Sequence, residues 1–539
     1  MPSIPLRNDT IPSLIDAAAQ HFGDTIYLGE GEVRISFNEL RTRTRQVATA
    51  LIARGIEKGD RIAIWAPNIY EWVIAAYGLQ SIGAVLVTLN TRYKRAEAGF
   101  ILRKSGAKLL FCIDNFLNAD YPGMLAEEEL PALNEIVLLR PQTDSPQRTQ
   151  TDSPQRKSSD RHTSWQAFLD SGSTISAQQI DARAQAVHGD DTADILFTSG
   201  TTGAPKGVMA GHGQNLRTFR YWADVIGLQA GDRYLIIGPF FHSFGYKAGL
   251  LTALMCGCTA LPQLVFDTEQ ILKRIQHERI NVMPGPPTLF QSILAFPNWQ
   301  QYDISSLQRA ATGAAAIPVE LIRQMREILK IDTVISAYGL TECCGTATMC
   351  HPDDDAETIA KTSGRAIEGT EVKCIDSDGN AVPCGEPGEI VIRGYNVMQG
   401  YFENPQATAD TIDKDGWLHT GDVGVLDTRG NLRITDRLKD MFITGGFNVY
   451  PAEIENILAT HPQLAMTAAI GIPDERMGEV CMVWAVKKAG GGLTAEQLIQ
   501  WCRDNMANYK VPRRVEFVDA LPLNASGKVL KTELRARIK

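Results

Sequence analysis

Apolar residues recur at helical spacing over residues 36–54, and two short apolar runs follow at residues 61–65 and 84–88. The periodic segment predicts an amphipathic helix, because a helix returns to the same face every 3.6 residues, and the short runs predict buried strands. Strands that alternate with helices are typical of layered α/β architecture. We therefore expect an α/β fold for the first part of the chain.

A second block of alternating helix-like and strand-like segments begins near Lys439, where the sequence pattern changes. The chain is also longer than the ~250–300 residues at which a single hydrophobic core stops growing, so more than one domain is expected. We predict a large multi-sheet N-terminal domain over residues 1–438 and a small α+β C-terminal domain over residues 439–539. The second block shows helical periodicity at residues 452–458 and 494–506 and strand-like runs at residues 466–472 and 480–486.

A tandem repeat interrupts the alternating pattern, because Q-T-D-S-P-Q-R occurs at residues 142–148 and again at residues 150–156. The repeat is polar, contains prolines and offers no apolar side chain to a core, which is typical of an exposed, mobile loop. A local duplication in a tolerant surface loop is the simplest explanation, and a functional role is the alternative.

Composition and charge exclude several classes of protein. The chain has 53 Lys and Arg against 62 Asp and Glu, and the net charge of −9 argues against a general nucleic-acid binder. It contains no uninterrupted run of about 18 apolar residues, so we expect no integral membrane segment. The ten cysteines form no C-x-x-C pair, which indicates free thiols in a reducing, cytoplasmic environment rather than a zinc site.

The strongest chemical signal is the string T-S-G-T-T-G-A-P-K-G at residues 198–207, which follows an apolar run at residues 195–197. It combines four hydroxyl side chains, three glycines and the positive charge of Lys206. Glycine lets the backbone turn its N–H groups toward an anion, and the hydroxyls and the lysine add further donors. We therefore expect a loop that binds a polyphosphate. Its spacing differs from that of the common P-loop, so another kind of nucleotide-using enzyme is indicated.

Further motifs follow this loop along the chain. They are Y-G-L-T-E at 338–342, T-G-D at 420–422, D-R-L-K-D at 436–440, G-G-F-N-V-Y-P-A-E at 445–453 and P-L-N-A-S-G-K at 522–528. Together with the glycine-rich loop, they resemble the adenylate-forming superfamily of acyl-CoA synthetases, peptide-synthetase adenylation domains and luciferases. The resemblance implies a large N-terminal domain and a small C-terminal domain that rotates between two half-reactions about a hinge at Lys439.

A narrower resemblance rests on F-F-H-S-F-G-Y-K-A-G at 240–249, M-P-G-P-P-T at 283–288, D-D-D-A at 353–356 and the string at 436–453. These strings are similar to actinobacterial acyl-CoA ligases that activate the propionate side chain of a steroid-derived bicyclic (hexahydroindanedione) acid. The resemblance implies that ATP, Mg²⁺ and coenzyme A are used to turn a carboxylic acid into an acyl-adenylate and then an acyl-CoA.

The resemblance also implies roles for single residues. Thr198, Lys206 and Glu342 would act on the phosphates, with Glu342 and Thr198 beside Mg²⁺, a hard ion that prefers oxygen ligands. Lys528 would reach the substrate carboxylate and the α-phosphate, and His242 would gate or line the acyl site. With the adenine and ribose contacts included, the ATP-binding set is Thr198, Ser199, Gly200, Thr201, Thr202, Gly203, Lys206, Gly313, Ala314, Ala315, Tyr338, Gly339, Thr341, Asp422, Arg437 and Lys528.

Two further groups of residues follow from the same resemblance. After rotation of the small domain, Gly445, Gly446 and Phe447 would line the tunnel for the pantetheine arm of coenzyme A. Small and apolar side chains dominate the predicted acyl pocket and Lys247 is its one charged neighbour, so a mostly apolar, wide acid is expected. The pocket residues are Phe241, His242, Tyr246, Gly249, Ala316, Cys343 and Gly345.

Other functions stay open. A medium- or long-chain fatty acyl-CoA synthetase would carry the same motifs, and a free-standing adenylating enzyme would load a carrier protein instead of coenzyme A. A luciferase-like oxygenating enzyme and a non-catalytic binding protein fit less well, the latter because every motif lysine and acid is present. The sequence also leaves open whether the chain forms a homodimer.

Overall fold

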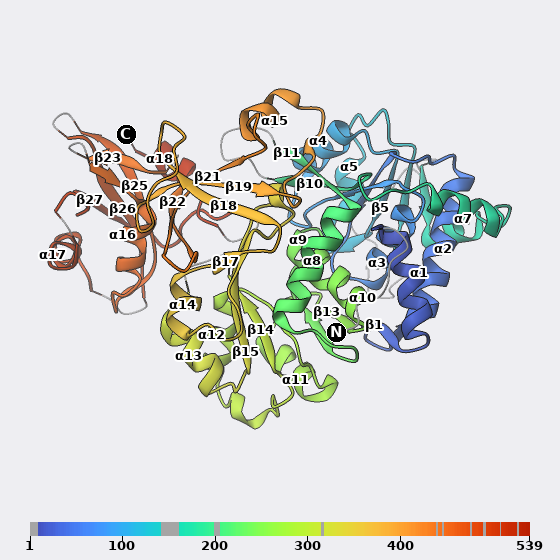
Figure 1. The fold of residues 1–539 in the computed structure, drawn as a ribbon, viewed down its shortest axis with the longest axis horizontal. Coiled ribbons are helices and arrows are strands. Elements are labelled where there is room, and N and C mark those ends of the chain that lie inside the picture. Colours follow the sequence, from blue (N-terminus) through green and yellow to red (C-terminus); the bar gives the residue numbers. More distant parts are fainter. Residues whose placement is uncertain are drawn as a thin grey trace, which may run out of the picture. The chain divides into compact units, whose positions relative to one another are not determined.

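The computed structural model describes residues 9–538 except 142–160, 199–204, 314–316, 438–439, 445–446, 475–476, 489–491, 507 and 525–527. The chain divides into two compact units, and each is discontinuous in sequence (Figure 1). The larger unit comprises Met1–Thr370 with Arg393–Gly416, and the smaller unit comprises Glu371–Ile392 with Trp417–Lys539.

An eight-stranded sheet is the largest in the larger unit. In spatial order its strands are β20 (Gly400–Tyr401), β11 (Lys206–Gly211), β10 (Thr192–Thr198), β4 (Val85–Thr88), β3 (Arg61–Trp65), β5 (Leu109–Cys112), β8 (Glu135–Leu138) and β9 (His162–Ser164). The strands from β10 to β9 are parallel, whereas β11 and β20 run antiparallel to their neighbours. Parallel strands are covered on both faces, which explains why β4 and β5 are apolar and buried throughout their length.

Two four-stranded sheets complete the scaffold of the larger unit. One has the order β12 (Arg233–Ile236), β13 (Thr259–Pro262), β1 (Ile26–Glu30) and β2 (Val33–Ser36). The other has the order β14 (Arg309–Thr312), β15 (Thr333–Tyr338), β16 (Thr348–Met349) and β17 (Arg365–Ala366), and its first two strands are parallel. A short ribbon consists of β6 (Asn115–Phe116) and β7 (Ala119–Asp120).

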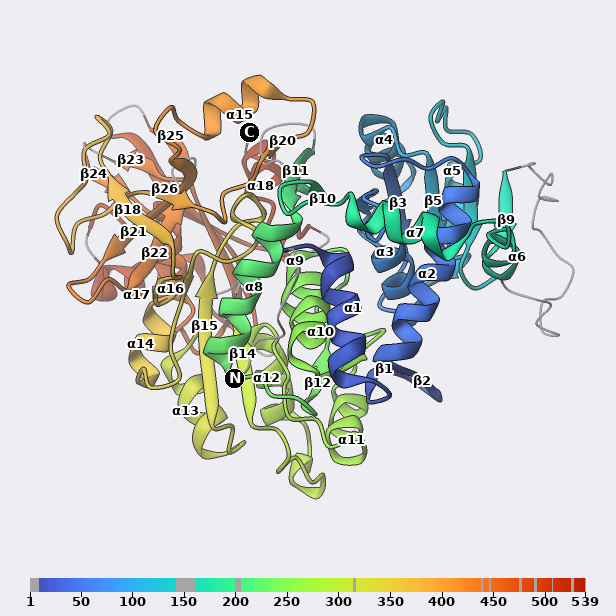
Figure 2. The ribbon, with the colours of Figure 1, turned by 45° about the vertical axis from the view of Figure 1, so that its right-hand side comes forward.

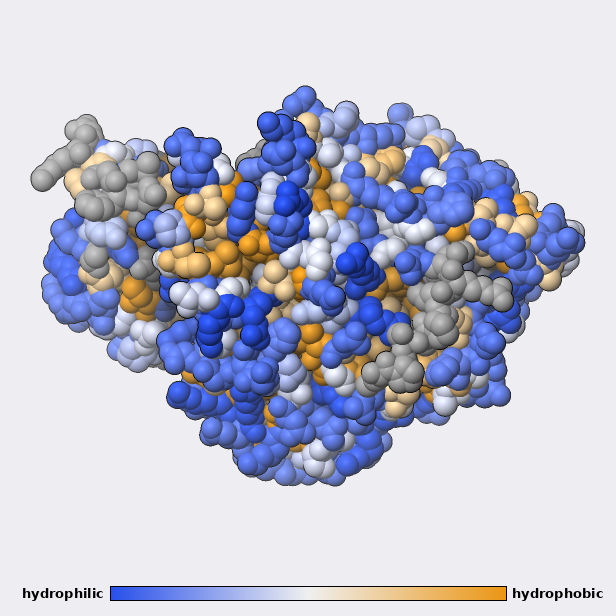
Figure 3. Space-filling view, in the orientation of Figure 1, coloured by the Kyte–Doolittle hydropathy of each residue, from blue (hydrophilic) through white to orange (hydrophobic). Residues whose placement is uncertain are grey.

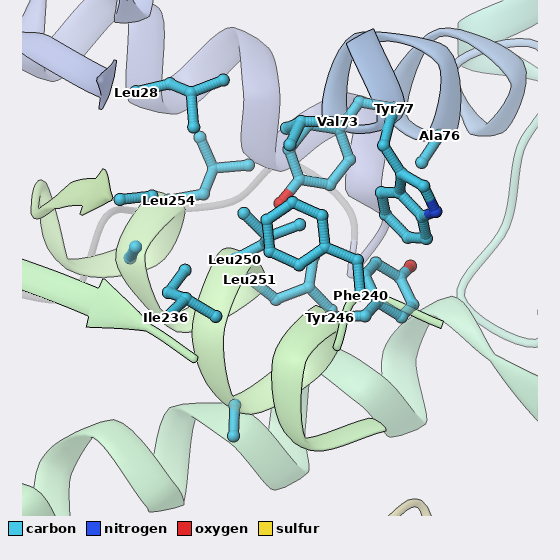
Figure 4. Close-up of a cluster of buried hydrophobic side chains, with 14 of the residues drawn as sticks. Leu28, Val73, Ala76, Tyr77, Ile236, Phe240, Tyr246, Leu250, Leu251 and Leu254 are labelled. Atoms are coloured by element: carbon cyan, nitrogen blue, oxygen red, sulfur yellow. The ribbon is translucent and has the colours of Figure 1, made fainter. Parts of the chain in front are cut away.

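Helices fill the space between these sheets. In α2 (Phe37–Ala53) the Ser36 hydroxyl accepts a hydrogen bond from Glu39 N and caps the first turn. In α3 (Tyr70–Gln80) every residue after the first is buried, and Figure 4 shows Val73 and Tyr77 directed at the apolar side chains around Leu250. The other helices are α1 (Ile11–Phe22), α4 (Arg95–Ser105), α5 (Tyr121–Leu125), α6 (Trp165–Asp170), α7 (Ala177–Gln185), α8 (His212–Ile226), α9 (Ser243–Gly245), the π-helix η1 (Tyr246–Leu251), α10 (Thr252–Cys256), α11 (Thr268–Glu278), α12 (Pro287–Ala295), η2 (Trp299–Gln301), α13 (Val319–Glu327), η3 (Thr341–Cys343), α14 (Ala356–Lys361) and α15 (Pro405–Thr411).

Within its described residues, the smaller unit contains two sheets and three helices. Figure 2 shows this unit from a second side. An antiparallel sheet has the order β18 (Thr370–Ile375), β19 (Gly388–Gly394), β21 (Leu418–Leu426) and β22 (Leu432–Arg437). The second sheet has the order β24 (Phe447–Val449), β23 (Phe442–Thr444), β26 (Gly478–Lys487) and β25 (Leu464–Asp474), and β27 (Arg514–Phe517) pairs with β26. The helices are α16 (Pro451–Leu458), α17 (Ala495–Asn505) and α18 (Lys531–Ala536).

Polar side chains cover most of the face that Figure 3 shows, and apolar side chains form small scattered patches on it. Of the ten cysteines, nine are buried and only Cys384, between β18 and β19, is exposed; none of the ten forms a disulfide. No helix within the described residues is long and apolar enough to cross a membrane.

The predicted α/β class, with a large first part and a smaller second part, is confirmed. The predicted boundary at Lys439 and the mobility of the C-terminal domain stay predictions. The two compact units do not meet at Lys439 in the sequence, because β18 and the start of β19 pack with the strands that follow Trp417. The repeat at residues 142–156 lies outside the described residues.

Candidate active site

The string predicted to bind phosphate begins on one of two antiparallel strands and ends on the other. Thr198 ends β10, Lys206 begins β11, and the two residues are register partners. The Thr198 hydroxyl donates to the carbonyl of Lys206 at 3.4 Å. The residues between them that were predicted to contact ATP, Ser199–Gly203, lie outside the described residues. The structure therefore brings Thr198 and Lys206 together at one end of the large sheet.

Glu342 lies beside this sheet end and is connected to it through Tyr401. The Tyr401 hydroxyl donates to Glu342 Oε1 at 2.9 Å, and Lys206 Nζ lies 4.7 Å from the centroid of the Tyr401 ring. Burial raises the pKa of Tyr401, and the neighbouring Glu342 carboxylate raises it further, so the phenol stays protonated at neutral pH. The sequence analysis missed Tyr401, because nothing local links a tyrosine to a glutamate 59 residues earlier in the chain.

The predicted adenine contacts meet at the carboxyl ends of two parallel strands. Gly313 follows β14, Tyr338 ends β15, and Thr312 is the register partner of Ser336. This is the edge at which parallel sheets commonly bind ligands. Gly339 must be glycine, because a Cβ there would clash with the carbonyl of Gly345. Ala314, Ala315 and Ala316 lie outside the described residues.

The loop that carries Phe241 and His242 contacts the segment after Glu342. A Cβ placed on Gly345 would lie 3.0 Å from Ser243 Oγ, so the two loops touch. His242 Nδ1 accepts a hydrogen bond from Phe244 N at 3.2 Å. His242 is exposed in this loop, although protein atoms surround much of its ring. These surroundings and the nearby charge of Lys247 lower the pKa of His242, which favours the neutral imidazole.

Three residues predicted to line the acyl pocket are packed within the protein. Tyr246 is fully buried and accepts a hydrogen bond from Gln80 Nε2 at 2.7 Å. A Cβ on Gly249 would lie 2.8 Å from Ile236 Cγ2, and Cys343 is buried with its sulfur 3.1 Å from Leu340 N. In this arrangement they contribute packing rather than open surface. Phe241, half-buried, and Gly345 remain beside His242.

Lys247 forms a completely buried ion pair. Its Nζ lies 2.9 Å from Asp194 Oδ1, and both side chains are at most 1% exposed. Asn215 Nδ2 donates to the other oxygen of Asp194 at 2.6 Å. The positive charge that the sequence places beside the acyl pocket is therefore neutralised inside the protein, which agrees with an apolar acid.

The smaller unit positions the predicted ribose contacts on adjacent strands. Asp422 on β21 is buried and is the register partner of Arg437 on β22, whose side chain lies outside the described parts. Glu389 on β19 fixes the irregular stretch of β21 before Asp422, because its Oε1 accepts from Gly421 N at 3.2 Å and its Oε2 lies 2.9 Å from His419 Nδ1. Glu389 was not predicted from the sequence.

Lys528 is exposed in the same unit. Its N–H donates to Asn524 Oδ1 at 2.8 Å, and its carbonyl accepts from Asn524 N at 2.8 Å. Of the other residues predicted in this unit, Lys439, Gly445 and Gly446 lie outside the described residues, and Phe447 begins β24.

Comparison with known proteins gives matches over almost the whole chain. Residues 15–402 match the family model described as AMP-binding enzyme, and residues 453–528 match the AMP-binding enzyme C-terminal domain. The chain is 46% identical, over 98% of both chains, to the 3-((3aS,4S,7aS)-7a-methyl-1,5-dioxo-octahydro-1H-inden-4-yl)propanoyl:CoA ligase of Rhodococcus jostii (strain RHA1). It is 45% identical, again over 98% of both chains, to the ligase of the same name from Mycobacterium tuberculosis. Among solved structures it is similar to an anthranilate CoA ligase in complex with anthranoyl-AMP, with a TM-score of 0.83 and 26% identity over 99% of this chain and 98% of the other.

Proposed function

The chain belongs to the family of AMP-binding enzymes, and we propose that the acid it joins to coenzyme A is a steroid-derived bicyclic propanoate. It is an AMP-forming acid–CoA ligase: the acid and ATP give an acyl-adenylate and pyrophosphate, and coenzyme A then displaces AMP. The observation that carries the proposal about the acid is 46% identity, over 98% of both chains, to a ligase named for such an acid.

In the first half-reaction, negative charge develops around the phosphorus that the carboxylate attacks. Lys206 and the hydroxyl of Thr198 flank the phosphate-binding string and supply donors to the departing pyrophosphate. Tyr338 covers one face of adenine and Gly313 leaves room beside it, while Asp422 accepts hydrogen bonds from the ribose. Arg437, the register partner of Asp422, approaches the same sugar. Lys528 brings a positive charge to the substrate carboxylate and the α-phosphate.

The residues around Glu342 fit a magnesium ion that is shared with the nucleotide. The described residues contain no cluster of three or more His, Cys, Asp or Glu that could hold a metal ion by itself. Mg²⁺ commonly uses one or two protein carboxylates together with phosphate oxygens and water, and Glu342 supplies such a carboxylate next to the phosphate-binding strands. Thr198 would contribute a hydroxyl. When bound, the ion would neutralise charge on the phosphates.

In the second half-reaction the small domain rotates about Lys439, which removes Lys528 and lets the thiol of coenzyme A enter. Gly445, Gly446 and Phe447 then line the tunnel for its pantetheine arm. His242, in the solvent-accessible loop beside Gly345, gates or lines the acyl pocket. The apolar character of the acid is supported by the neutralised charge of Lys247.

A panel of acids tests this proposal. The purified protein is incubated with ATP, Mg²⁺, coenzyme A and a bicyclic dioxo-propanoate, an aryl acid or a straight-chain acid, and both pyrophosphate and thioester are measured. We expect kcat/KM for the bicyclic acid to exceed that for the straight-chain acids by on the order of 100-fold. A preference for straight-chain acids would overturn the proposed acid and favour a fatty acyl-CoA synthetase. Adenylate without thioester would point to a carrier protein as acceptor.

A further inference from the structure

Tyr401 is held rigidly at the edge of the large sheet. It belongs to β20, a strand of two residues in which Tyr401 pairs with Val208 of β11. Its N–H donates to Thr408 Oγ1 at 2.9 Å, and the next N–H, of Phe402, donates to the carbonyl of Gly207 at 2.7 Å. The backbone is therefore fixed on both sides of the tyrosine, and the side chain is only 7% exposed.

From this position the tyrosine contacts two groups of opposite charge. Its hydroxyl donates to Glu342 Oε1 at 2.9 Å, while the Lys206 ammonium lies over its ring, 4.7 Å from the centroid. A phenol offers a hydrogen-bond donor at its tip and a negative face on its ring, so one side chain can hold both groups. Without it, Lys206 and Glu342 would be drawn toward each other by their charges.

The contact with Glu342 occupies only one carboxylate oxygen. The backbone of Glu342 is fixed as well, because its carbonyl accepts from Met398 N at 2.8 Å. Among the described residues, no second side chain forms a hydrogen bond with the Glu342 carboxylate. Oε2 is therefore left for an external cation, and the direction in which it points is set by the tyrosine.

We propose that Tyr401 is a positioning residue for adenylation, which orients the Glu342 carboxylate through its hydroxyl and the Lys206 ammonium through its ring. The inference rests on the proposed function, since it assumes that Glu342 and Lys206 act on the phosphates and their metal. The two contacts use different parts of the side chain, so they can be removed separately.

Direct binding measurements separate the two contacts. Tyr401→Phe keeps the ring and removes the hydroxyl, and Tyr401→Leu removes both. Binding of ATP with Mn²⁺, followed by calorimetry and by the electron paramagnetic resonance of Mn²⁺, is compared with binding of ATP in EDTA. We expect Tyr401→Phe to weaken binding of the Mn²⁺–ATP complex by about tenfold and to leave the affinity for metal-free ATP unchanged. A loss of this size is typical when a residue that orients a metal ligand is removed. Tyr401→Leu should additionally weaken metal-free ATP by roughly three- to tenfold, because the lysine loses its ring.

Tyr395→Phe is the matched control. Tyr395 is half-buried, and like Tyr401 it has a cation over its ring, with Arg217 at 3.8 Å from the centroid. The hydrogen bond to Glu342 and the ring contact with Lys206 both belong to Tyr401. This variant should bind both forms of ATP as the wild type does. In a Glu342→Gln background, Tyr401→Phe should have no further effect on binding with Mn²⁺.

Wild-type affinity of Tyr401→Phe for Mn²⁺–ATP would overturn the inference, and so would an equal loss of both forms of ATP. Tyr401→Phe keeps the size and shape of the side chain. If Tyr401→Leu lowers the melting temperature, the test therefore rests on Tyr401→Phe alone. Failure of the proposed function looks different, because the wild type would then make no adenylate from any acid of the panel.

Discussion

At the scale of single residues, the proposed role of the Lys528 charge can be tested directly by mutation. If its ammonium meets the α-phosphate, Lys528→Ala removes a cation from the place where negative charge develops. We expect adenylation, measured as pyrophosphate release, to fall by about two to three orders of magnitude. Thioester formation from pre-made acyl-adenylate should persist, because the lysine has left the site in that step.

Lys488→Ala provides the control, since it removes an exposed lysine of the same unit. It should leave both half-reactions unchanged. An equal loss of both half-reactions in Lys528→Ala would contradict the assigned role.

Glu389 sets a second residue-scale prediction. Glu389→Ala removes the acceptor for Gly421 N and the partner of His419, so the stretch of β21 before Asp422 loosens. We expect the KM for ATP to rise about five- to tenfold, the equivalent of one ordinary hydrogen bond, while kcat at saturating ATP changes less. Steady-state kinetics measure both values, and Glu386→Ala, an exposed neighbour, is the control. If Asp422 binds ribose, the effects of Glu389→Ala and Asp422→Ala on the KM for ATP should not add. Additive effects would show that Glu389 does not act through Asp422.

At the scale of elements, the Lys247–Asp194 pair joins the π-helix η1 to β10, the strand that ends at Thr198 in the predicted phosphate-binding string. Asp194→Ala leaves a buried ammonium without its carboxylate, which should cost about 3–5 kcal/mol of unfolding free energy. The double change Asp194→Asn with Lys247→Met removes both charges, so it should recover most of this loss. Urea unfolding followed by tryptophan fluorescence measures the difference. If the single change costs no more than the double change, the charge pair is not what stabilises this junction.

The same elements show how far sequence patterns predict this fold. The helix expected at residues 36–54 is α2, and the strand expected at residues 61–65 is β3 with the same bounds. The helix is predicted because its buried face repeats with the helical period, and the strand because a parallel strand covered on both faces is a nearly continuous apolar run. The pairing of Tyr401 with Glu342 has no such period, since it depends on how β20 adds to the edge of a sheet. Likewise, the sequence placed Lys247 beside a pocket, and only the fold shows that Asp194 neutralises it.

At the scale of the whole molecule, His212 connects parts of the chain that are 201 residues apart. It begins α8, is fully buried, and its Nδ1 accepts from Ile11 N at the start of α1, at 3.3 Å. Burial lowers the pKa of His212 to about 4, since an imidazolium would lose its hydration there; the Asp191 carboxylate partly opposes this shift, and the charge of Lys58 adds to it. The unfolded chain takes up a proton near pH 6.5, whereas the folded chain resists until about pH 4, so this contribution to stability is complete above pH 6.5 and is lost as the pH falls.

His212→Asn tests this linkage, because the amide oxygen can still accept from Ile11 N but does not titrate. Between pH 7 and pH 5 the wild type should lose about 2 kcal/mol more unfolding free energy than the variant does. Urea unfolding at the two pH values measures this difference. His277→Asn, at an exposed histidine, should keep the acid sensitivity of the wild type. An unchanged acid sensitivity in His212→Asn would assign the effect to other groups.

The distribution of the thiols has a practical consequence. Nine cysteines are enclosed, and burial raises the pKa of those near the active site, that of Cys343 to about 12 and that of Cys344 to about 11, so they offer almost no thiolate to a reagent. Cys384 alone faces solvent, on the connection between β18 and β19 in the smaller unit. The unmodified enzyme therefore carries one natural attachment point for a maleimide dye. A single fluorophore there would report from the smaller unit during each half-reaction without a cysteine-free background.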